Sequence, residues 1–161
     1  MGRGKRKRNI GTSKRFFRNR YIGRLPDELE LPLYKRLLAD DKTIVVMPKL
    51  PEEEEELAAL IERANFLPAE GALLFKMESS ACHRNAADLW LSGREPDCRS
   101  EVAGCALMSG YALSDDNLWR QHSWVTTREG QIVETTTPRT RYFGYTMNTE
   151  EAEQFASANW P

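Results

Sequence analysis

The chain has 161 residues, of which 40% are hydrophobic and 29% charged, the balance expected of one soluble globular domain with a tail. No apolar run reaches the roughly 18 residues that a membrane-spanning helix needs, and the basic start lacks the apolar stretch of a secretory signal. We therefore expect a cytoplasmic protein without a membrane partner, and its odd count of 3 cysteines favours reduced thiols over a disulfide framework.

The charges are distributed very unevenly, although the net charge is only −1. Residues 1–26 contain ten Lys or Arg and no acidic residue, which leaves 13 basic and all 24 acidic residues to the rest of the chain. A polar, cationic segment interrupted by glycines favours disorder. We therefore predict a flexible basic arm over residues 1–24 and a single domain over residues 25–161.

The basic arm raises a hypothesis of its own, because cations interleaved with aromatic rings can neutralise phosphates and stack bases. The residues predicted to contact nucleic acid are Arg6, Lys7, Arg8, Arg15, Phe16 and Arg18. Residues 5–8 also resemble a nuclear-localisation signal, and the whole arm could instead fold onto its own acidic body or onto a partner's acidic face. One hypothesis is therefore a non-catalytic nucleic-acid-binding or assembly protein that acts through this arm.

The body of the chain predicts helices first and strands afterwards. Hydrophobic spacing and helix-terminal residues indicate helices over residues 26–41, 51–64, 79–90 and 148–159. Alternating or apolar runs indicate strands over residues 43–47, 102–113, 118–127, 131–137 and 141–147. This order predicts an α+β fold in which helices pack on an antiparallel four-stranded sheet.

The ends of two of these helices can be assigned to particular residues. Ser79 or Ser80 is expected to cap the helix over residues 79–90, and Gly93 to end it. Asn148 and Glu151 have the spacing of a capping box for the last helix.

Cys82 falls in the first turn of the helix that Ser79 or Ser80 would cap. The free backbone N–H groups and the positive end of the helix dipole in that turn favour a thiolate. A nucleophilic cysteine also needs a base within hydrogen-bond reach, and the chain offers only His83 and His122. His83 lies about 100° around the helix from Cys82 and does not face it, so His122 is the candidate base.

His122 belongs to a predicted hairpin whose turn decides which residues face it. A three-residue loop, Arg128–Gly130, would place Gly130 in the left-handed conformation and pair Thr127 with Gln131. In that register Glu134 lies diagonal to His122 on the same face of the sheet, at roughly 7–8 Å between backbones. A two-residue loop would send Glu134 to the other face, but the turn residues favour the longer loop.

These residues make up a possible catalytic triad. Cys82 would be the nucleophile, His122 the general base and acid, and Glu134 the group that orients the imidazole. Backbone N–H groups at a helix N-terminus can also stabilise an oxyanion, which suits acyl transfer. Each residue alone is equally compatible with a structural role: a core cysteine, a packed histidine or a solvent-facing glutamate.

Three further residues are candidates for substrate binding. Trp119 and Trp124 flank His122 and could exclude water. Arg141, together with Arg139 and Tyr142, could bind an anionic part of the substrate or cover a strand edge. A zinc site is the alternative for part of this set. Its ligands would be Cys82, His83, Cys98, Cys105 and His122, but they lack any recognised zinc spacing, so no metal is expected.

Four segments between residues 75 and 147 together resemble the transglutaminase-like branch of the papain-like cysteine enzymes. They are Cys82–Leu89 on a helix, the strand Val102–Tyr111, His122–Val125, and Ile132–Thr136. The resemblance implies a papain-like fold and the triad of Cys82, His122 and Glu134, with Glu134 where such families usually carry Asp or Asn. It also implies an amide, ester or thioester substrate, which could be a protein, and no cofactor.

Overall fold

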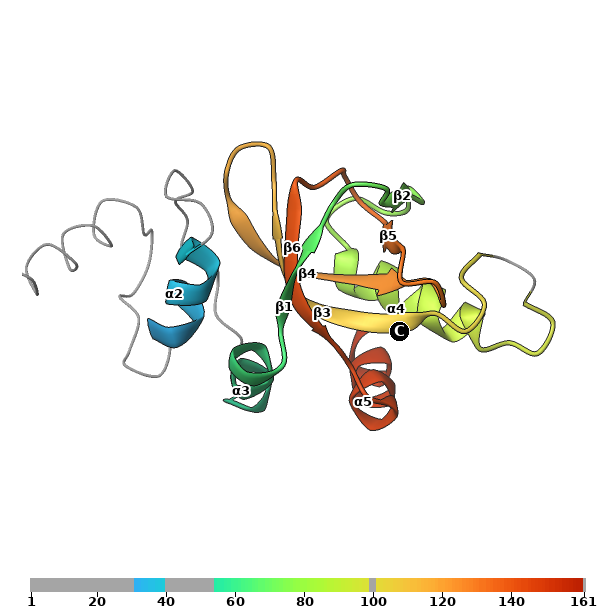
Figure 1. Cartoon of the computed structure of the whole chain (residues 1–161). Coiled ribbons are helices and arrows are strands. Elements are labelled where there is room, and N and C mark those ends of the chain that lie inside the picture. The colour runs from blue at the N-terminus through green and yellow to red at the C-terminus, as the bar shows by residue number, and fades with distance from the viewer. Residues whose placement is uncertain (1–30, 40–53, 99–100, 161) are drawn as a thin grey trace, which may run out of the picture.

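The computed structural model describes residues 31–39, 54–98 and 101–160 (Figure 1). The predicted basic arm over residues 1–24, with its six candidate nucleic-acid contacts, lies outside the described residues, as does the predicted strand over residues 43–47.

Within the described residues the chain forms four helices and six strands. The helices are α2 (Leu31–Ala39), α3 (Glu54–Glu62), α4 (Cys82–Gly93) and α5 (Thr149–Asn159). The strands are β1 (Asn65–Pro68), β2 (Leu73–Leu74), β3 (Ala106–Leu113), β4 (Trp119–Thr126), β5 (Ile132–Glu134) and β6 (Arg141–Thr146). No described helix has the length and apolar character to cross a bilayer.

The strands form one mixed, curled sheet in the order β1-β6-β3-β4-β5-β2, so the predicted antiparallel four-stranded sheet is wrong (Figure 1). β2 runs parallel to β5, and the other neighbours are antiparallel. The sequence did not indicate β1 and β2 because they have only four and two residues, too few to show an alternating pattern. β6 also does not continue the meander after β5 but crosses to the far edge of β3.

The two faces of the sheet bury different side chains, because neighbouring residues of a strand point to opposite sides. On one face, Trp119 and Phe143 join Leu33 of α2 and Leu60 of α3 in a hydrophobic cluster. On the other face, Trp124 packs with a second cluster that includes Met108 and Tyr142. Alternation along β4 places His122 on the face of Trp124, and the two rings are 6.0 Å apart at their centroids.

The predicted hairpin register is confirmed. Val125 lies opposite Val133, and the backbone N–H of Thr127 donates to the carbonyl of Gln131 at 2.8 Å. Gly130 has a φ of 83°, the left-handed conformation that the three-residue loop requires. The turn therefore places Glu134 on the same face of the sheet as His122.

The ends of α4 and α5 match the predictions only in part. Gly93 is the last residue of α4, as expected, and Asn148 forms the predicted capping box of α5 with Glu151. The predicted cap of α4 is wrong. Its N-cap is Ala81, which has no side-chain hydrogen bond, and Ser80 precedes it with a φ of 62°.

Parallel pairing with β5 also fixes the segment that leads towards α4. The backbone N–H groups of Phe75 and Met77 donate to the carbonyls of Glu134 and Thr135, each at 2.8 Å. The chain therefore runs alongside the strand of Glu134 shortly before it enters the helix that begins at Cys82.

Candidate active site

Cys82, the first residue of α4, lies against β4, on which the helix packs. Burial raises the pKa of its thiol, but interactions with the His122 side chain and with the backbone of Ser123 and His83 lower it overall, which places these groups beside the sulfur. Cys82 is partly exposed, whereas Cys105 is buried. The residue predicted as nucleophile thus meets its predicted base, although 40 positions separate them in the sequence.

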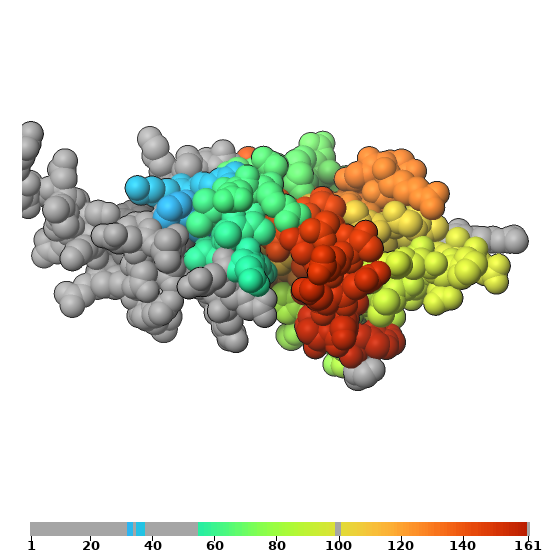
Figure 2. All heavy atoms as spheres, turned by 90° about the horizontal axis from the view of Figure 1, so that it is seen from below, coloured from blue at the N-terminus to red at the C-terminus, as the bar shows by residue number. Residues whose placement is uncertain are grey.

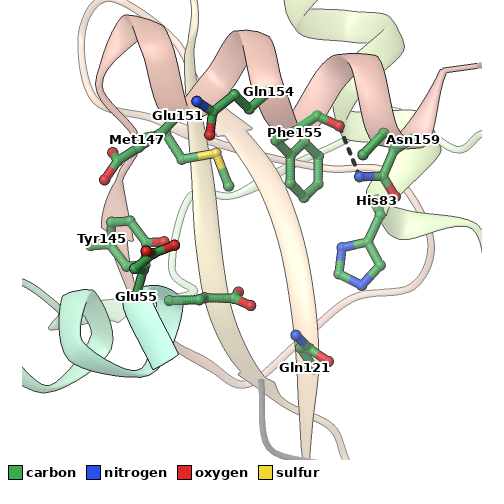
Figure 3. A pocket seen from close by; sticks show the side chains of 11 residues that line it. Glu55, His83, Gln121, Tyr145, Met147, Glu151, Gln154, Phe155 and Asn159 are labelled. Atoms are coloured by element: carbon green, nitrogen blue, oxygen red, sulfur yellow. Dashed lines mark hydrogen bonds between the residues drawn. The ribbon is translucent and has the colours of Figure 1, made fainter. Parts of the chain in front are cut away.

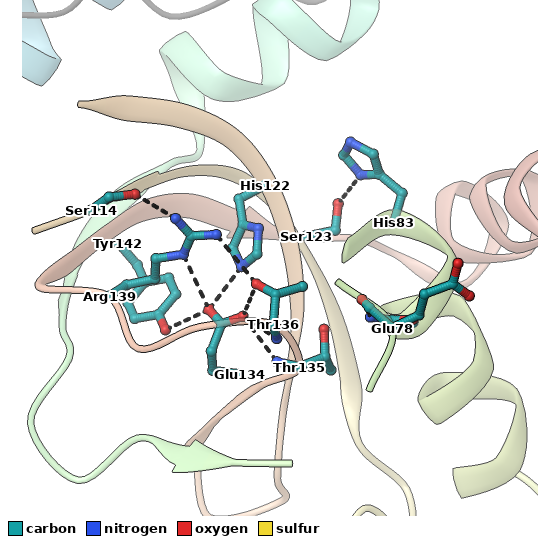
Figure 4. Close-up of polar contacts among 11 residues, drawn as sticks. Glu78, His83, Ser114, His122, Ser123, Glu134, Thr135, Thr136, Arg139 and Tyr142 are labelled. Carbon is teal, nitrogen blue, oxygen red and sulfur yellow. Dashed lines mark hydrogen bonds and ion pairs between the residues drawn. The ribbon is translucent and has the colours of Figure 1, made fainter. Parts of the chain in front are cut away.

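His122 is almost completely buried, with 1% of its surface exposed. Its Nε2 lies 2.8 Å from Oε2 of Glu134 (Figure 4), which leaves Nδ1 of the ring for the contact with Cys82. The imidazole is therefore held between a thiol and a carboxylate, the arrangement of a Cys-His-acid triad.

The Glu134 carboxylate is fixed by donors on both oxygens. Oε1 accepts the backbone N–H groups of Thr135 and Thr136, each at 2.9 Å, and the Thr136 hydroxyl at 2.8 Å. Oε2 accepts the Tyr142 hydroxyl at 2.9 Å as well as the contact with His122. With its oxygens satisfied in this way, the carboxylate has one orientation, and so does the imidazole that it holds.

A guanidinium completes the surroundings of Glu134. Nε of Arg139 lies 3.8 Å from Oε2 of Glu134, while its two terminal nitrogens donate to the hydroxyls of Ser114 and Thr136 (Figure 4). Arg139 is thus anchored on two sides while its positive charge faces the carboxylate.

The electrostatics of the three residues favour an ion pair. Burial by itself raises the pKa of the Cys82 thiol, but the hydrogen bond and charge of His122, with the backbone N–H groups of Ser123 and His83, lower it overall. Burial likewise lowers the pKa of His122, but the contacts with Cys82 and Glu134 raise it overall. The shifts in opposite directions favour thiolate and imidazolium together.

Glu134 remains ionised despite its burial. Burial raises its pKa, but the hydrogen bond and charge of His122, followed by the Thr136 donors, bring that pKa down to about 2. Tyr142 responds in the opposite way, because burial and the adjacent Glu134 charge raise the pKa of its hydroxyl. At neutral pH the tyrosine is therefore a hydrogen-bond donor to the carboxylate.

Of the three predicted substrate-binding residues, only Trp124 lies beside the triad. Its ring is nearly parallel to that of His122, at an interplanar angle of 21°, but it is fully buried and so packs the site. Trp119 contacts Phe66 within the cluster on the opposite face of the sheet. The Arg141 guanidinium lies over the Phe66 ring, 5.3 Å from its centroid. The structure therefore does not bring Trp119 and Arg141 to His122.

Two side chains that surround Glu134 were not predicted there from the sequence. Tyr142 and Arg139 were considered only for an external anion or a strand edge, whereas the anion that they contact is the chain's own Glu134. Period-two alternation along β6 could have placed Tyr142 on the face opposite Phe143 and Tyr145. His83, set aside as a base, has its Nδ1 2.7 Å from the Ser123 hydroxyl (Figure 4).

The described residues contain no group of three or more His, Cys, Asp or Glu side chains that could hold a metal ion. The five residues considered for zinc all belong to the described part of the chain, and they do not form such a group.

Comparison with known proteins identifies no relative: no family model, no curated protein and no solved structure matches the chain. The resemblance to the transglutaminase-like enzymes stays a prediction from short motifs.

Proposed function

We propose that the protein is a cysteine-dependent acyl-transfer enzyme, a hydrolase or transferase that acts on an amide, ester or thioester carbonyl. The observation that carries the proposal is the buried His122, held between the thiol of Cys82 and the carboxylate of Glu134. A histidine in this position can take up and release a proton at the sulfur while the carboxylate keeps the ring oriented.

In the first half of the reaction, the Cys82 thiolate attacks the carbonyl carbon and forms a carbon–sulfur bond. The tetrahedral intermediate collapses as His122 donates its proton to the leaving amine, alcohol or thiol. In the second half, His122 takes a proton from water or an amine, which attacks the thioester and expels the thiolate. The scheme balances without a cofactor.

The start of α4 supports this chemistry in a second way. Burial raises the pKa of the Cys82 thiol, and the backbone N–H groups of His83 and Ser123 are among the groups near the sulfur that lower it. During attack the negative charge moves from sulfur to the adjacent carbonyl oxygen, and oriented backbone donors nearby favour that charge. These two groups are our candidates for the oxyanion hole.

The pH dependence of thiol alkylation tests the proposal. The rate of Cys82 modification by iodoacetamide, followed by peptide mass spectrometry from pH 5 to pH 9, should remain high at pH 6. In His122→Asn the rate at pH 6 should fall about a hundredfold, because an ordinary thiol with a pKa near 8.5 has well under 1% thiolate there.

His83→Asn is the matched control, since it removes the other histidine and retains the backbone N–H beside Cys82. It should keep most of the reactivity at pH 6. A direct readout of acyl transfer is the appearance of an acetyl group on Cys82 after exposure to 4-nitrophenyl acetate. An ordinary alkylation profile in the wild-type protein, together with no acetyl-enzyme, would overturn the proposal.

A further inference from the structure

A cavity of about 470 Å³ lies at the start of α4, the helix that begins with Cys82 (Figure 3). Its walls also come from α3 and α5, which are neighbours on the face drawn in Figure 2, and from the strands β4 and β6. Cys82 and His122 do not line it. Its lining includes His83, the residue after Cys82, and Gln121, which alternation along β4 places on the face opposite His122. The volume falls in the range of roughly 300–1,000 Å³ found for small-ligand sites.

The cavity combines an apolar wall with carboxylates. Tyr145, Met147 and Phe155 supply the apolar surface, and Glu55, Glu56 and Glu151 supply the acidic groups. None of the described residues that line it is Lys or Arg. Figure 3 shows Glu55 and Tyr145 at one end of the cavity and His83 at the other, with α5 along one side.

The three carboxylates are not neutralised equally. Glu151 forms an ion pair with Arg63 at 2.6 Å, so its charge is already balanced. Glu56 accepts the neutral Ser109 hydroxyl at 2.8 Å, and Glu55 is exposed. Within the described part of the chain, neither Glu55 nor Glu56 has an ion-pair partner, and the cavity therefore keeps a negative charge beside α3.

The opposite end of the cavity has a fixed shape. The contact between Nδ1 of His83 and the Ser123 hydroxyl holds the imidazole, which meets the Phe155 ring edge-on at 5.7 Å between centroids. Ser123 therefore connects the cavity with Cys82. Its backbone lies near the Cys82 sulfur, and its side chain positions His83 in the cavity wall.

We propose that this cavity binds a cationic group of the substrate, an ammonium or guanidinium joined by an apolar stem to the scissile carbonyl. The stem would lie along Phe155 and Met147, and the charge would reach Glu55 and Glu56, as Lys and Arg side chains allow. The inference rests on the proposed function, because it assigns the substrate class of the same site.

Charged thiol reagents, applied to the full chain, test whether the cavity prefers a cationic group. Methanethiosulfonates carrying a trimethylammonium group, a plain methyl group or a sulfonate group are compared at Cys82 by peptide mass spectrometry. Each rate is divided by the rate of the same reagent with 2-mercaptoethanol, which removes intrinsic reactivity. The corrected cation-to-anion ratio should be at least about tenfold, since a negative cavity concentrates cations.

Glu55→Gln combined with Glu56→Gln should reduce this ratio severalfold, and the rate with the methyl reagent is the neutral reference for each variant. Glu129→Gln is the matched control, because Glu129 is an exposed glutamate in the β4–β5 turn, away from the cavity. An unchanged ratio in the double variant, with Cys82 still fast towards the methyl reagent, would overturn the cavity assignment and leave the enzyme proposal standing. Slow reaction with all three reagents in the wild-type protein would instead overturn the proposed function.

Discussion

The helices α4 and α5 begin in opposite ways. At the start of α5, the Asn148 side chain accepts the N–H of Glu151 at 2.9 Å, and the Glu151 carboxylate accepts the N–H of Asn148 at 2.7 Å. At the start of α4, Ala81 has no side chain able to cap, and the first residue of the helix is Cys82.

This difference separates a helix start closed by its own side chains from one that has no side-chain cap. A capping box satisfies backbone donors that would otherwise be exposed. In α4 burial raises the pKa of the Cys82 thiol, but His122 and the backbone of Ser123 and His83 lower it overall. In the proposed enzyme, a helix start without a side-chain cap leaves its backbone donors to the nucleophile.

Glu134→Gln should produce the largest change in Cys82 reactivity at the start of α4, and it should leave the capping box of α5 intact. Without the carboxylate, His122 loses the charge that raises its pKa, and Cys82 reactivity at pH 6 should fall about tenfold. Removing one partner of a buried pair should also reduce the free energy of unfolding by roughly 3 kcal/mol. Alkylation kinetics and urea unfolding measure the two effects.

The pH dependence of stability gives the same variant a second test. The pKa of Glu134 in the folded protein, about 2, lies below its ordinary value of 4.5. Its contribution to stability is therefore complete above pH 4.5 and is lost as the pH falls towards 2. The stability difference between wild type and Glu134→Gln should shrink over that interval, and a constant difference would contradict the assigned ion pair.

Tyr142→Phe keeps the carboxylate of Glu134 and removes one of its hydrogen-bond donors. The free energy of unfolding at neutral pH should therefore fall by less than in Glu134→Gln.

Ala81→Asp would give α4 an acidic side chain at the position where α5 has Asn148. A carboxylate there would compete for the N–H groups of the first turn and repel the thiolate, which should raise the pKa of Cys82. We expect a severalfold slower alkylation at pH 6 and little change at pH 9. Ala81→Asn, a cap without the charge, separates competition from repulsion. Undiminished reactivity at pH 6 in both variants would show that the uncapped start is unimportant for the thiol.

Asn148→Ala should have the smallest effect. Loss of an N-cap side chain costs about 1 kcal/mol, so the free energy of unfolding should fall by that amount. Cys82 alkylation at pH 6 should not change, because α5 contributes no group to the triad. A change in alkylation rate comparable to that of Ala81→Asp would mean that the two helix starts are not independent.

The sequence indicated the contacts of Glu134 and His122 more closely than it indicated the sheet, because those contacts depend on fewer intervening residues. The turn Arg128–Gly130 has local chemistry that fixes its register, so the relation of His122 to Glu134 could be derived over 12 positions. The contact of His122 with Cys82 could only be inferred from a pattern of motifs, since no local rule joins a helix to a distant strand.

Features with short or mixed signals could not be predicted. β2 has only two residues, Leu73 and Leu74, and it forms because β5 offers an edge to pair with. The start of α4 was misread because two serines precede Cys82, and serine is a frequent cap. Ser80 instead has a left-handed backbone, and the helix begins after Ala81. Trp119 and Trp124 have the same residue type but odd and even positions in β4, which send them to opposite faces of the sheet.

The parallel pairing of β2 with β5 has a consequence for when the thiol becomes reactive. Leu73 and Val133 are 60 positions apart, and such distant partners meet late because closing a long loop is entropically costly. Until that pairing forms, the segment before Cys82 and the strand of Glu134 are independent pieces of chain. Under the proposed function, a nascent or partly unfolded molecule would therefore carry an ordinary thiol, and the reactive thiolate would arise only with the completed fold.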